Sequence, residues 1–186
     1  FTPGKDACVF DLYGIPVALT ICEDIWHQAP MLQASAAGAK LMININASPF
    51  HQHKFQERID LLSLRAKEGD MPILYVNQVG GQDELVFDGA SFAVQKNGEH
   101  CLQAPFYDEG LFLVELVVDA DDVSFTPQVL PQHSGIPNIV YDALVLGVRD
   151  YVRKNGFKRA VLGLSGGIDS ALTLAIAVDA LGADAV

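Results

Sequence analysis

The sequence has 186 residues, of which 50% are apolar, and a formal net charge of −11 at pH 7. This composition excludes a disordered chain and argues against a nucleic-acid partner, whose phosphates so acidic a protein would repel. No apolar run is long enough to cross a bilayer, and the three cysteines follow no disulfide or metal-binding spacing, so we expect a cytoplasmic protein without a membrane partner.

The first hundred residues alternate between patterns typical of strands and of helices. Apolar, β-branched runs predict strands, whereas polar segments with apolar residues three or four positions apart predict helices. In chain order we predict a strand at 14–21, a helix at 31–39, a strand at 40–46, a helix at 55–68 and strands at 71–78, 91–95 and 111–118. We expect these elements to form one domain, residues 1–120.

A second, shorter unit follows a proline-rich connection. Prolines fix the backbone and remove hydrogen-bond donors, so we interpret residues 121–137 as a linker. Beyond it we predict a helix at 138–154, a strand at 160–164, a helix at 171–180 and the beginning of another strand. One strand and one helix cannot bury both faces of a parallel sheet, so we expect residues 138–186 to be the start of a longer domain. With Phe1 in place of an initiator methionine, we expect a piece truncated at both ends.

A glycine-rich turn connects the predicted strand at 160–164 to the helix that follows. Such a turn gathers backbone N–H groups at a helix N-terminus and suits a phosphate. The turn lacks the lysine of the ordinary mononucleotide loop and carries Asp169 instead, so we expect Mg²⁺ to supply the positive charge. One alternative is a glycine-rich turn that binds no ligand. Asp169 can also serve as a helix cap, a role that is compatible with binding Mg²⁺. The predicted phosphate-binding residues are Gly163, Leu164, Ser165, Gly166, Gly167, Ile168, Asp169 and Ser170.

Cys22 is the candidate nucleophile. It follows the predicted strand at 14–21, a position where a thiol can be reached by substrate. Taken alone, a cysteine in such a place is more often an inert core residue, and Glu23 and Asp24 disfavour a thiolate. His51 and His53 lack further ligands at suitable spacing, so we predict no metal there.

Several segments resemble one enzyme family. Residues 46–50 and 75–92, together with the run from Cys22 to Trp26, are similar to the nitrilase-like glutaminase domain of the glutamine-dependent NAD⁺ synthetases. The turn at 163–170 resembles the pyrophosphate loop of ATP pyrophosphatases. In this family, the synthetase domain begins with such a loop. The resemblance implies an α/β fold, in which the C-terminal part of a nitrilase-type αββα sandwich precedes the first βα unit of an adenine-nucleotide α-hydrolase-like, Rossmann-like domain.

The resemblance also implies a reaction. Cys22 would attack the side-chain amide of glutamine and release ammonia, leaving a glutamyl thioester, while Ser48 and Lys54 bind the amino-acid end of glutamine. ATP would adenylate deamido-NAD⁺, and ammonia would displace AMP to give NAD⁺. The loop would hold the ATP phosphates, and Asp169 would bind Mg²⁺. Glutamine, ATP and deamido-NAD⁺ are thus the implied substrates, and a homo-oligomer is the implied assembly.

One part of the family pattern is not found in this sequence. The family's glutaminase also uses a Glu base and a Lys upstream of the cysteine, and only 21 residues precede Cys22. Lys5 lies in a loop that does not match, so we assign no further triad member and expect this piece alone to be inactive. Three alternatives stay open: a nitrilase-class hydrolase of another amide, a ligase with another acceptor, and a module that only packs against partners. The segment 80–84 favours deamido-NAD⁺ as the acceptor.

Overall fold

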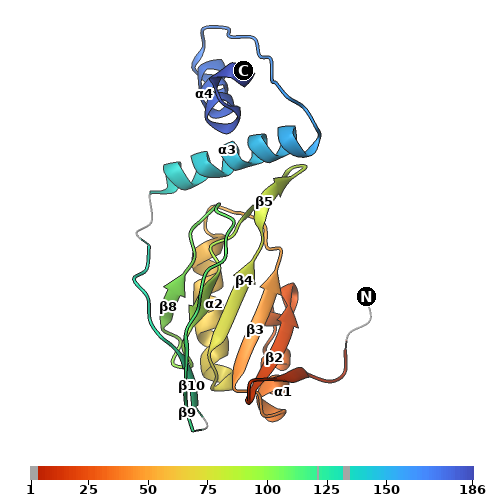
Figure 1. Cartoon of the computed structure of the whole chain (residues 1–186), viewed down its shortest axis with the longest axis vertical. Coiled ribbons are helices and arrows are strands. Elements are labelled where there is room, and N and C mark those ends of the chain that lie inside the picture. Colours follow the sequence, from red (N-terminus) through yellow and green to blue (C-terminus); the bar gives the residue numbers. More distant parts are fainter. Residues whose placement is uncertain (1–3, 121, 132–134) are drawn as a thin grey trace.

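The computed structural model describes residues 4–120, 122–131 and 135–186. Within them, a mixed six-stranded sheet carries two helices on one face, a long helix crosses beyond one end of the sheet, and the last helix packs on that one (Figure 1). In spatial order the sheet strands are β1 (Cys8–Leu12), β2 (Ile15–Ile21), β3 (Leu41–Asn46), β4 (Ile73–Asn77), β7 (Phe92–Val94) and β8 (His100–Gln103). The two separate hairpins are β5 (Val79–Gln82) with β6 (Leu85–Asp88), and β9 (Leu116–Asp119) with β10 (Asp122–Phe125). The helices are η1 (Cys22–Trp26), α1 (Gln28–Ala36), α2 (Lys54–Gly69), α3 (Ile136–Lys154), α4 (Ile168–Leu181) and η2 (Ala183–Ala185), of which η1 and η2 are short 3₁₀ turns.

Strands β2, β3 and β4 run parallel in the middle of the sheet. Ile21 pairs with Ile45, and Asn46 pairs with Asn77, so the three strands end at one edge. The segments that follow them start at that edge: η1 after β2, the loop 47–53 after β3, and the β5–β6 hairpin after β4. Because ligand-binding groups collect at the carboxyl ends of parallel strands, this edge is where a site is expected.

The helical face of the sheet holds the larger apolar core. Helices α1 and α2 pack on it, and Met42, Leu62 and Ile73 are fully buried in that layer. Burying each of these side chains contributes on the order of 2 kcal/mol. This packing fixes α2 with its first residue, Lys54, directly after the loop that leaves the carboxyl edge of the sheet.

The opposite face of the sheet is covered in part by the described residues. The β9–β10 hairpin belongs to a second apolar cluster, in which Val123 and Phe125 are buried with Val17 of the sheet. The exposed part of this face has the composition of a packing surface rather than of a solvated one. Its exposed apolar residues towards the carboxyl edge are Ile21, Ile45 and Val76.

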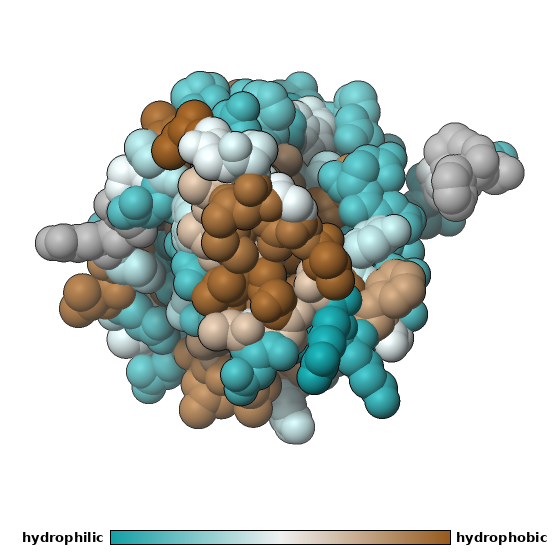
Figure 2. Space-filling view, turned by 90° about the horizontal axis from the view of Figure 1, so that it is seen from above, coloured by the Kyte–Doolittle hydropathy of each residue, from teal (hydrophilic) through white to brown (hydrophobic). Residues whose placement is uncertain are grey.

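Helix α3 joins the two parts of the chain. It packs against the β5–β6 hairpin and also against α4, and Leu146 and Ala177 are buried in these two helices. Seen from above, an apolar patch lies over the end of the molecule that carries α4 (Figure 2). The exposed apolar side chains of this region include Val161, Leu164 and Ile168. A second surface suited to packing is therefore found in the C-terminal part of the chain.

Most of the predicted elements are confirmed. The strands at 14–21, 40–46, 71–78 and 91–95 correspond to β2, β3, β4 and β7, and the helices predicted at 31–39, 55–68, 138–154 and 171–180 correspond to α1, α2, α3 and α4, with ends shifted by a few residues. Residues 121 and 132–134 of the expected linker lie outside the described residues. Strand β10 and the first residues of α3 fall within the same stretch, and the domain boundaries stay predictions.

Three predictions of secondary structure are wrong in whole or in part. Residues 160–164 form no strand, because a strand needs a hydrogen-bonded neighbour, and within the described chain the Ala160 N–H alone reaches such an acceptor, the Ala185 carbonyl at 2.8 Å. The strand predicted at 111–118 is confirmed only from Leu116, where β9 begins; residues 111–115 form no strand, although the Glu115 carbonyl accepts the Thr126 N–H at 3.0 Å. The turn η2 stands where another strand was expected to begin.

Candidate functional site

Cys22 lies where β2 ends and the chain turns into η1. Its φ of 48° places it in the left-handed region, which costs a residue with a side chain about 1 kcal/mol. The Asp24 carboxylate accepts a hydrogen bond from the Ile21 N–H at 2.9 Å and holds this turn closed. The thiol is half-buried, without a disulfide. The predicted nucleophile therefore stands on a strained turn at the carboxyl edge of the sheet.

Ser48 is held by the neighbouring loop and helix. Its backbone N–H donates to the Asn77 Oδ1 at 2.9 Å, which joins the loop after β3 to the end of β4. Its hydroxyl oxygen accepts from the Nε and Nη2 of Arg58 at 3.2 and 3.0 Å. With its acceptor capacity used by the guanidinium, the Ser48 hydroxyl has its own proton to donate. Ser48 is thus a fixed donor rather than a solvated loop residue.

Arg58 and Asp88 form a buried ion pair beneath that loop. The Nη1 of Arg58 donates to both Asp88 oxygens at 2.9 and 3.0 Å, and each side chain is 1% exposed. Asn77 Nδ2 adds a further hydrogen bond to Asp88 at 3.2 Å. Burial raises the pKa of Asp88, and the Arg58 charge opposes that rise. Since two charges buried this deeply are tolerated only when fully paired, the pair fixes the loop in one geometry.

Lys54 brings the nucleophile segment and the loop together. Its ammonium lies 3.9 Å from the centroid of the Trp26 ring, at the end of η1, and 3.3 Å from the Glu57 carboxylate. A cation over an indole face is stabilised by about 0.5–1 kcal/mol when exposed. The two segments predicted to carry glutamine chemistry, one around Cys22 and the other from Ser48 to Lys54, therefore meet at this contact.

Arg65 anchors the nucleophile segment from the same helix. It lies two turns after Arg58 on α2, and its guanidinium donates to the carbonyls of Ile25 and Trp26 at 3.1 and 2.8 Å. Both arginines are more than nine-tenths buried. One rigid helix thus orients η1 through Arg65 and the Ser48 loop through Arg58. Neither arginine was predicted from the sequence; their seven-residue spacing on the face of Leu62 was the available signal.

The Tyr75 hydroxyl is a buried polar atom at the same place. Tyr75 is 1% exposed, and its hydroxyl makes no hydrogen bond of acceptable geometry within the described part of the chain, although Ser48 is beside it. Burial raises the pKa of Tyr75, against the opposing charge of Arg58 and the Ser48 hydroxyl. Tyr75 is therefore a neutral donor close to Ser48 at neutral pH.

The glycine-rich loop forms an exposed turn at the N-terminus of α4. Gly166 has a φ of +83°, which favours glycine, and Gly167 is the N-cap of the helix. The Ser170 hydroxyl accepts the Ser165 N–H at 3.2 Å and donates to the Gly167 carbonyl at 3.0 Å. These bonds close the turn on itself and leave the first N–H groups of the helix available to an anion.

Asp169 fits the predicted role in magnesium binding. It lies in the first turn of α4 and is exposed, so its carboxylate can serve both the helix N-terminus and a cation. Magnesium in nucleotide sites takes one or two carboxylates together with phosphate oxygens and water, which a single aspartate beside a phosphate loop satisfies. Among the described residues no group of three or more His, Cys, Asp or Glu side chains gathers to bind a metal. The expectation that His51 and His53 bind no metal stays a prediction.

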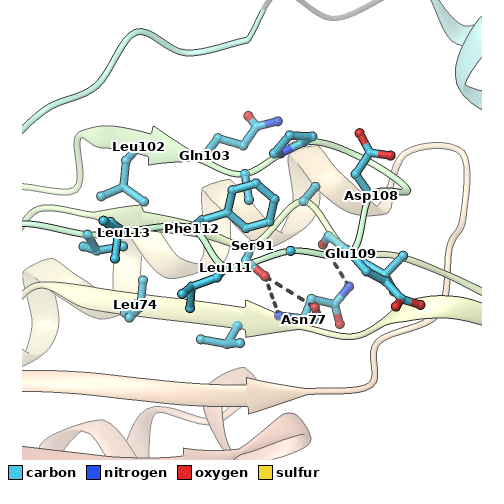
Figure 3. Close-up of a pocket in the computed structure, with 18 of the residues that line it drawn as sticks. Leu74, Asn77, Ser91, Leu102, Gln103, Asp108, Glu109, Leu111, Phe112 and Leu113 are labelled. Carbon is cyan, nitrogen blue, oxygen red and sulfur yellow. Dashed lines mark hydrogen bonds between the residues drawn. The ribbon is translucent and has the colours of Figure 1, made fainter.

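An apolar cavity lies apart from these residues. It has a volume of about 400 Å³ and lies between β4, β7, β8 and the segment 108–114, with Leu74, Leu102 and Phe112 in its wall (Figure 3). Asn77 and Ser91 form one end, where the Asn77 N–H donates to the Ser91 hydroxyl at 2.9 Å. None of the predicted site residues lines this cavity. It therefore belongs to the partly covered face of the sheet and not to the Cys22 site.

Two family models match the chain in sequence. Residues 1–126 match the carbon-nitrogen hydrolase model, and residues 140–186 match the NAD synthase model. The glutamine-dependent NAD(+) synthetase of Xylella fastidiosa strain Temecula1 is 48% identical over 189 residues, which are 99% of this chain and 34% of that protein. The enzyme of the same name from Acinetobacter baylyi is 42% identical over 186 residues, covering 100% of this chain and 34% of its own length. The chain spans about a third of the length of the curated relatives it matches.

Solved structures of the same two classes of protein have a similar fold. The glutamine-dependent NAD⁺ synthetase from Acinetobacter baumannii, in complex with ADP, superposes with a TM-score of 0.93 at 44% identity, covering 100% of this chain and 35% of that one. An amidase from Nesterenkonia superposes with a TM-score of 0.54 at 26% identity over 68% of this chain and 44% of that one. The predicted α/β fold, part of a nitrilase-type sandwich followed by the start of a nucleotide-binding domain, is confirmed.

Proposed function

Over residues 1–126 the chain belongs to the carbon-nitrogen hydrolase family, and from that premise we propose that the whole protein makes NAD⁺ with ammonia taken from glutamine. One observation carries the proposal. A single chain joins the Cys22 site to the phosphate loop through α3, and both parts match glutamine-dependent NAD⁺ synthetases in the same order.

In the glutaminase step, the Cys22 sulfur attacks the side-chain carbonyl carbon of glutamine. The carbonyl oxygen becomes an oxyanion, which the backbone N–H of Glu23 stabilises as the first residue beyond the nucleophile. The C–N bond then breaks, ammonia leaves with the proton taken from the thiol, and a glutamyl thioester remains. Water hydrolyses that thioester to glutamate and restores the thiol. The base and the lysine that the family adds to this step are not assigned to residues of this chain.

Ser48 and Lys54 bind the amino-acid end of glutamine in this proposal. The Ser48 hydroxyl, which accepts two N–H groups from Arg58, donates its proton to the glutamine carboxylate. The Lys54 ammonium, beside the Trp26 ring, contributes a positive charge that attracts the glutamine carboxylate. A donor fixed by a buried ion pair binds with little loss of entropy, since its rotamer is already set.

In the synthetase step, the nicotinate carboxylate of deamido-NAD⁺ attacks the α-phosphorus of ATP and pyrophosphate leaves. Ammonia then attacks the adenylated carbonyl carbon, and AMP leaves as NAD⁺ forms. The loop from Gly163 to Ser170 receives the phosphates through the open N–H groups at the start of α4. Asp169 would hold Mg²⁺, which offsets phosphate charge when bound. The ADP complex of the Acinetobacter baumannii relative supports a nucleotide site in this domain.

Assembly and location complete the proposal. Ammonia has to pass from one site to the other without being lost to solvent, which favours an enclosed path and a homo-oligomer. The three cysteines form no disulfide, which favours a reducing compartment such as the cytoplasm. No helix in the described ranges is both long and apolar enough to span a bilayer.

The proposal is tested with the whole protein, supplied with glutamine, Mg-ATP and deamido-NAD⁺, by measuring NAD⁺, AMP and glutamate. We expect NAD⁺ and AMP in equal amounts, and a Cys22→Ala variant that uses ammonium but not glutamine. Glutamate released without ATP use would instead support a hydrolase of the nitrilase class. AMP formed only with another acceptor would support a different ligase, and binding of neither glutamine nor Mg-ATP would support a packing module.

A further inference from the structure

The β5–β6 hairpin is held on α3 by the backbone N–H and carbonyl of Gly81. The Gly81 N–H donates to the Asp150 Oδ2 at 2.8 Å, and the Gly81 carbonyl accepts from the Lys154 Nζ at 2.8 Å. Asp150 and Lys154 lie one helical turn apart and form an ion pair at 3.1 Å. The hydrogen bond from Gly81 and the charge of Lys154 hold the pKa of Asp150 below its ordinary value, although burial opposes them. We call these three residues the α3 clamp.

The clamp depends on two glycines that let the hairpin and the helix approach. A Cβ on Gly81 would lie 3.1 Å from the Gly147 Cα and 3.2 Å from the Asp150 Cβ. A Cβ on Gly147 would lie 3.2 Å from the Val86 Cγ2. These distances are shorter than ordinary van der Waals contact, so a side chain at either position pushes the two elements apart.

The clamped hairpin also supports the glutamine loop. The Val86 carbonyl of β6 accepts a hydrogen bond from the Phe50 N–H at 2.6 Å, two residues after Ser48. Asp88, the last residue of β6, binds Arg58, and Arg58 holds the Ser48 hydroxyl. The loop that carries Ser48 is therefore tied to the hairpin in two ways, directly by the backbone bond of Phe50 and indirectly through Arg58, which pairs with Asp88.

A second link runs from α3 to the same place. The Tyr107 hydroxyl donates to the Ile139 carbonyl of α3 at 2.9 Å, and the Tyr107 N–H donates to the Asp88 carbonyl at 3.0 Å. Asp88 is thus connected to α3 on two sides, through the hairpin and through Tyr107. We expect these hydrogen-bonded elements to follow a shift of the helix.

We propose that Asp150 and Lys154 are positioning residues for glutamine: by clamping the β5–β6 hairpin to α3, they set the position of Ser48 from the helix that leads to the phosphate loop. The inference deepens the proposed function and rests on it. When the clamp opens, the Ser48 donor moves away from the glutamine carboxylate, while the phosphate loop keeps its own internal bonds. The expected consequence is a specific weakening of glutamine use relative to ammonium use.

The test compares three variants of the whole protein. Asp150→Ala removes the acceptor of the Gly81 N–H, Asp150→Asn keeps an oxygen acceptor, and Asp142→Ala is the control. Asp142 lies on the same helix, is exposed and makes no hydrogen bond or ion pair with other described residues. We expect Asp150→Ala to raise the KM for glutamine about fivefold, the effect of one lost hydrogen bond. In Asp150→Ala the ratio of glutamine-dependent to ammonium-dependent NAD⁺ formation should fall by the same factor. Asp150→Asn should recover most of the wild-type ratio, and Asp142→Ala should have the wild-type ratio.

A purely structural role gives a different pattern. If the clamp only stabilised the fold, Asp150→Ala would lower glutamine-dependent and ammonium-dependent rates in parallel, and that result overturns the proposal. A glutamine KM within twofold of the wild type overturns it too.

Hydrogen exchange separates this inference from the proposed function. In Asp150→Ala the peptides 79–88 and 47–53 should both exchange faster than in the wild type, whatever the reaction is. Faster exchange at 79–88 with unchanged exchange at 47–53 contradicts the link to Ser48. A wild-type protein that makes no NAD⁺ from either nitrogen source refutes the proposed function, while the exchange result still decides whether the clamp controls the loop.

Discussion

Replacing Arg58 by methionine tests whether the buried ion pair holds the Ser48 loop. The change keeps the length and apolar stem of the side chain but removes every guanidinium contact. Asp88 is then left 1% exposed, with Asn77 as its remaining side-chain partner among the described residues. Breaking a buried pair from one side costs about 3–5 kcal/mol, a large fraction of the 5–15 kcal/mol that typically stabilises a domain.

The assay is urea unfolding of the whole protein, followed by thiol labelling of Cys101 with peptide-resolved mass spectrometry. Cys101 is buried in the sheet, so its labelling reports on this domain alone. We expect Arg58→Met to lower the free energy of unfolding by about 3–5 kcal/mol. The double variant Arg58→Met with Asp88→Leu should recover part of that loss, because no buried charge is left unpaired. Arg153→Met, at an exposed position on α3, is the control.

Two results would refute this reasoning. Arg58→Met within 1 kcal/mol of the wild type would mean that water or a rearranged side chain satisfies Asp88. If the double variant lost as much free energy of unfolding as Arg58→Met and Asp88→Leu lose together when each is made alone, the two residues would not interact energetically.

Three further predictions concern other contacts. Lys54→Met should raise the KM for glutamine about tenfold, the effect of one lost charge contact, as measured by initial rates; an unchanged KM would contradict the role of Lys54. Asp169→Asn should raise the Mg²⁺ concentration needed for half-maximal AMP formation, and an unchanged titration would remove Asp169 from the cation site. Asp150 has a lowered pKa in the fold, so the stability it adds is present above about pH 4 and is lost as the pH falls through its folded pKa. The protection of the amides at 79–88, measured as the exchange rate relative to the intrinsic rate at each pH, should therefore fall only at acidic pH, and a loss of protection that begins near neutral pH would exclude Asp150 as its cause.

The central sheet could be predicted because its strands are apolar on both faces. The runs at 14–21, 40–46 and 71–78 indicate strands without any knowledge of their neighbours, since parallel strands buried on both sides are nearly continuous in apolar residues. The run at 160–164 looks the same in sequence, yet it is not a strand here, because pairing depends on a neighbour. The hairpin that contains Gly80 and Gly81 was not predicted, because glycine has a low strand propensity. Glycine is suited to this strand because the absence of a side chain lets the hairpin pack closely on α3.

The candidate site was predictable only in its outline. The sequence indicated Cys22, Ser48 and Lys54, and the structure brings their segments together through the contact of Lys54 with Trp26. The roles of these residues stay predictions. Arg58 and Arg65 looked like exposed residues of a polar helix. Their spacing on the face of Leu62 indicates burial, but nothing local indicates that an acid 30 residues later pairs with Arg58. Asp150 and Lys154 looked like an ordinary charged helix end for the same reason.

The transfer of ammonia from Cys22 to the nucleotide site is the central claim, and one labelling experiment tests it directly. The whole protein is given glutamine with heavy nitrogen in its side-chain amide, together with unlabelled ammonium, Mg-ATP and deamido-NAD⁺, and the NAD⁺ is analysed by mass spectrometry. The account predicts heavy nitrogen in the NAD⁺ amide at a level above its share of the free ammonium pool, and none in the Cys22→Ala variant. NAD⁺ whose label only matches the free pool, or a labelled product from Cys22→Ala, would contradict it.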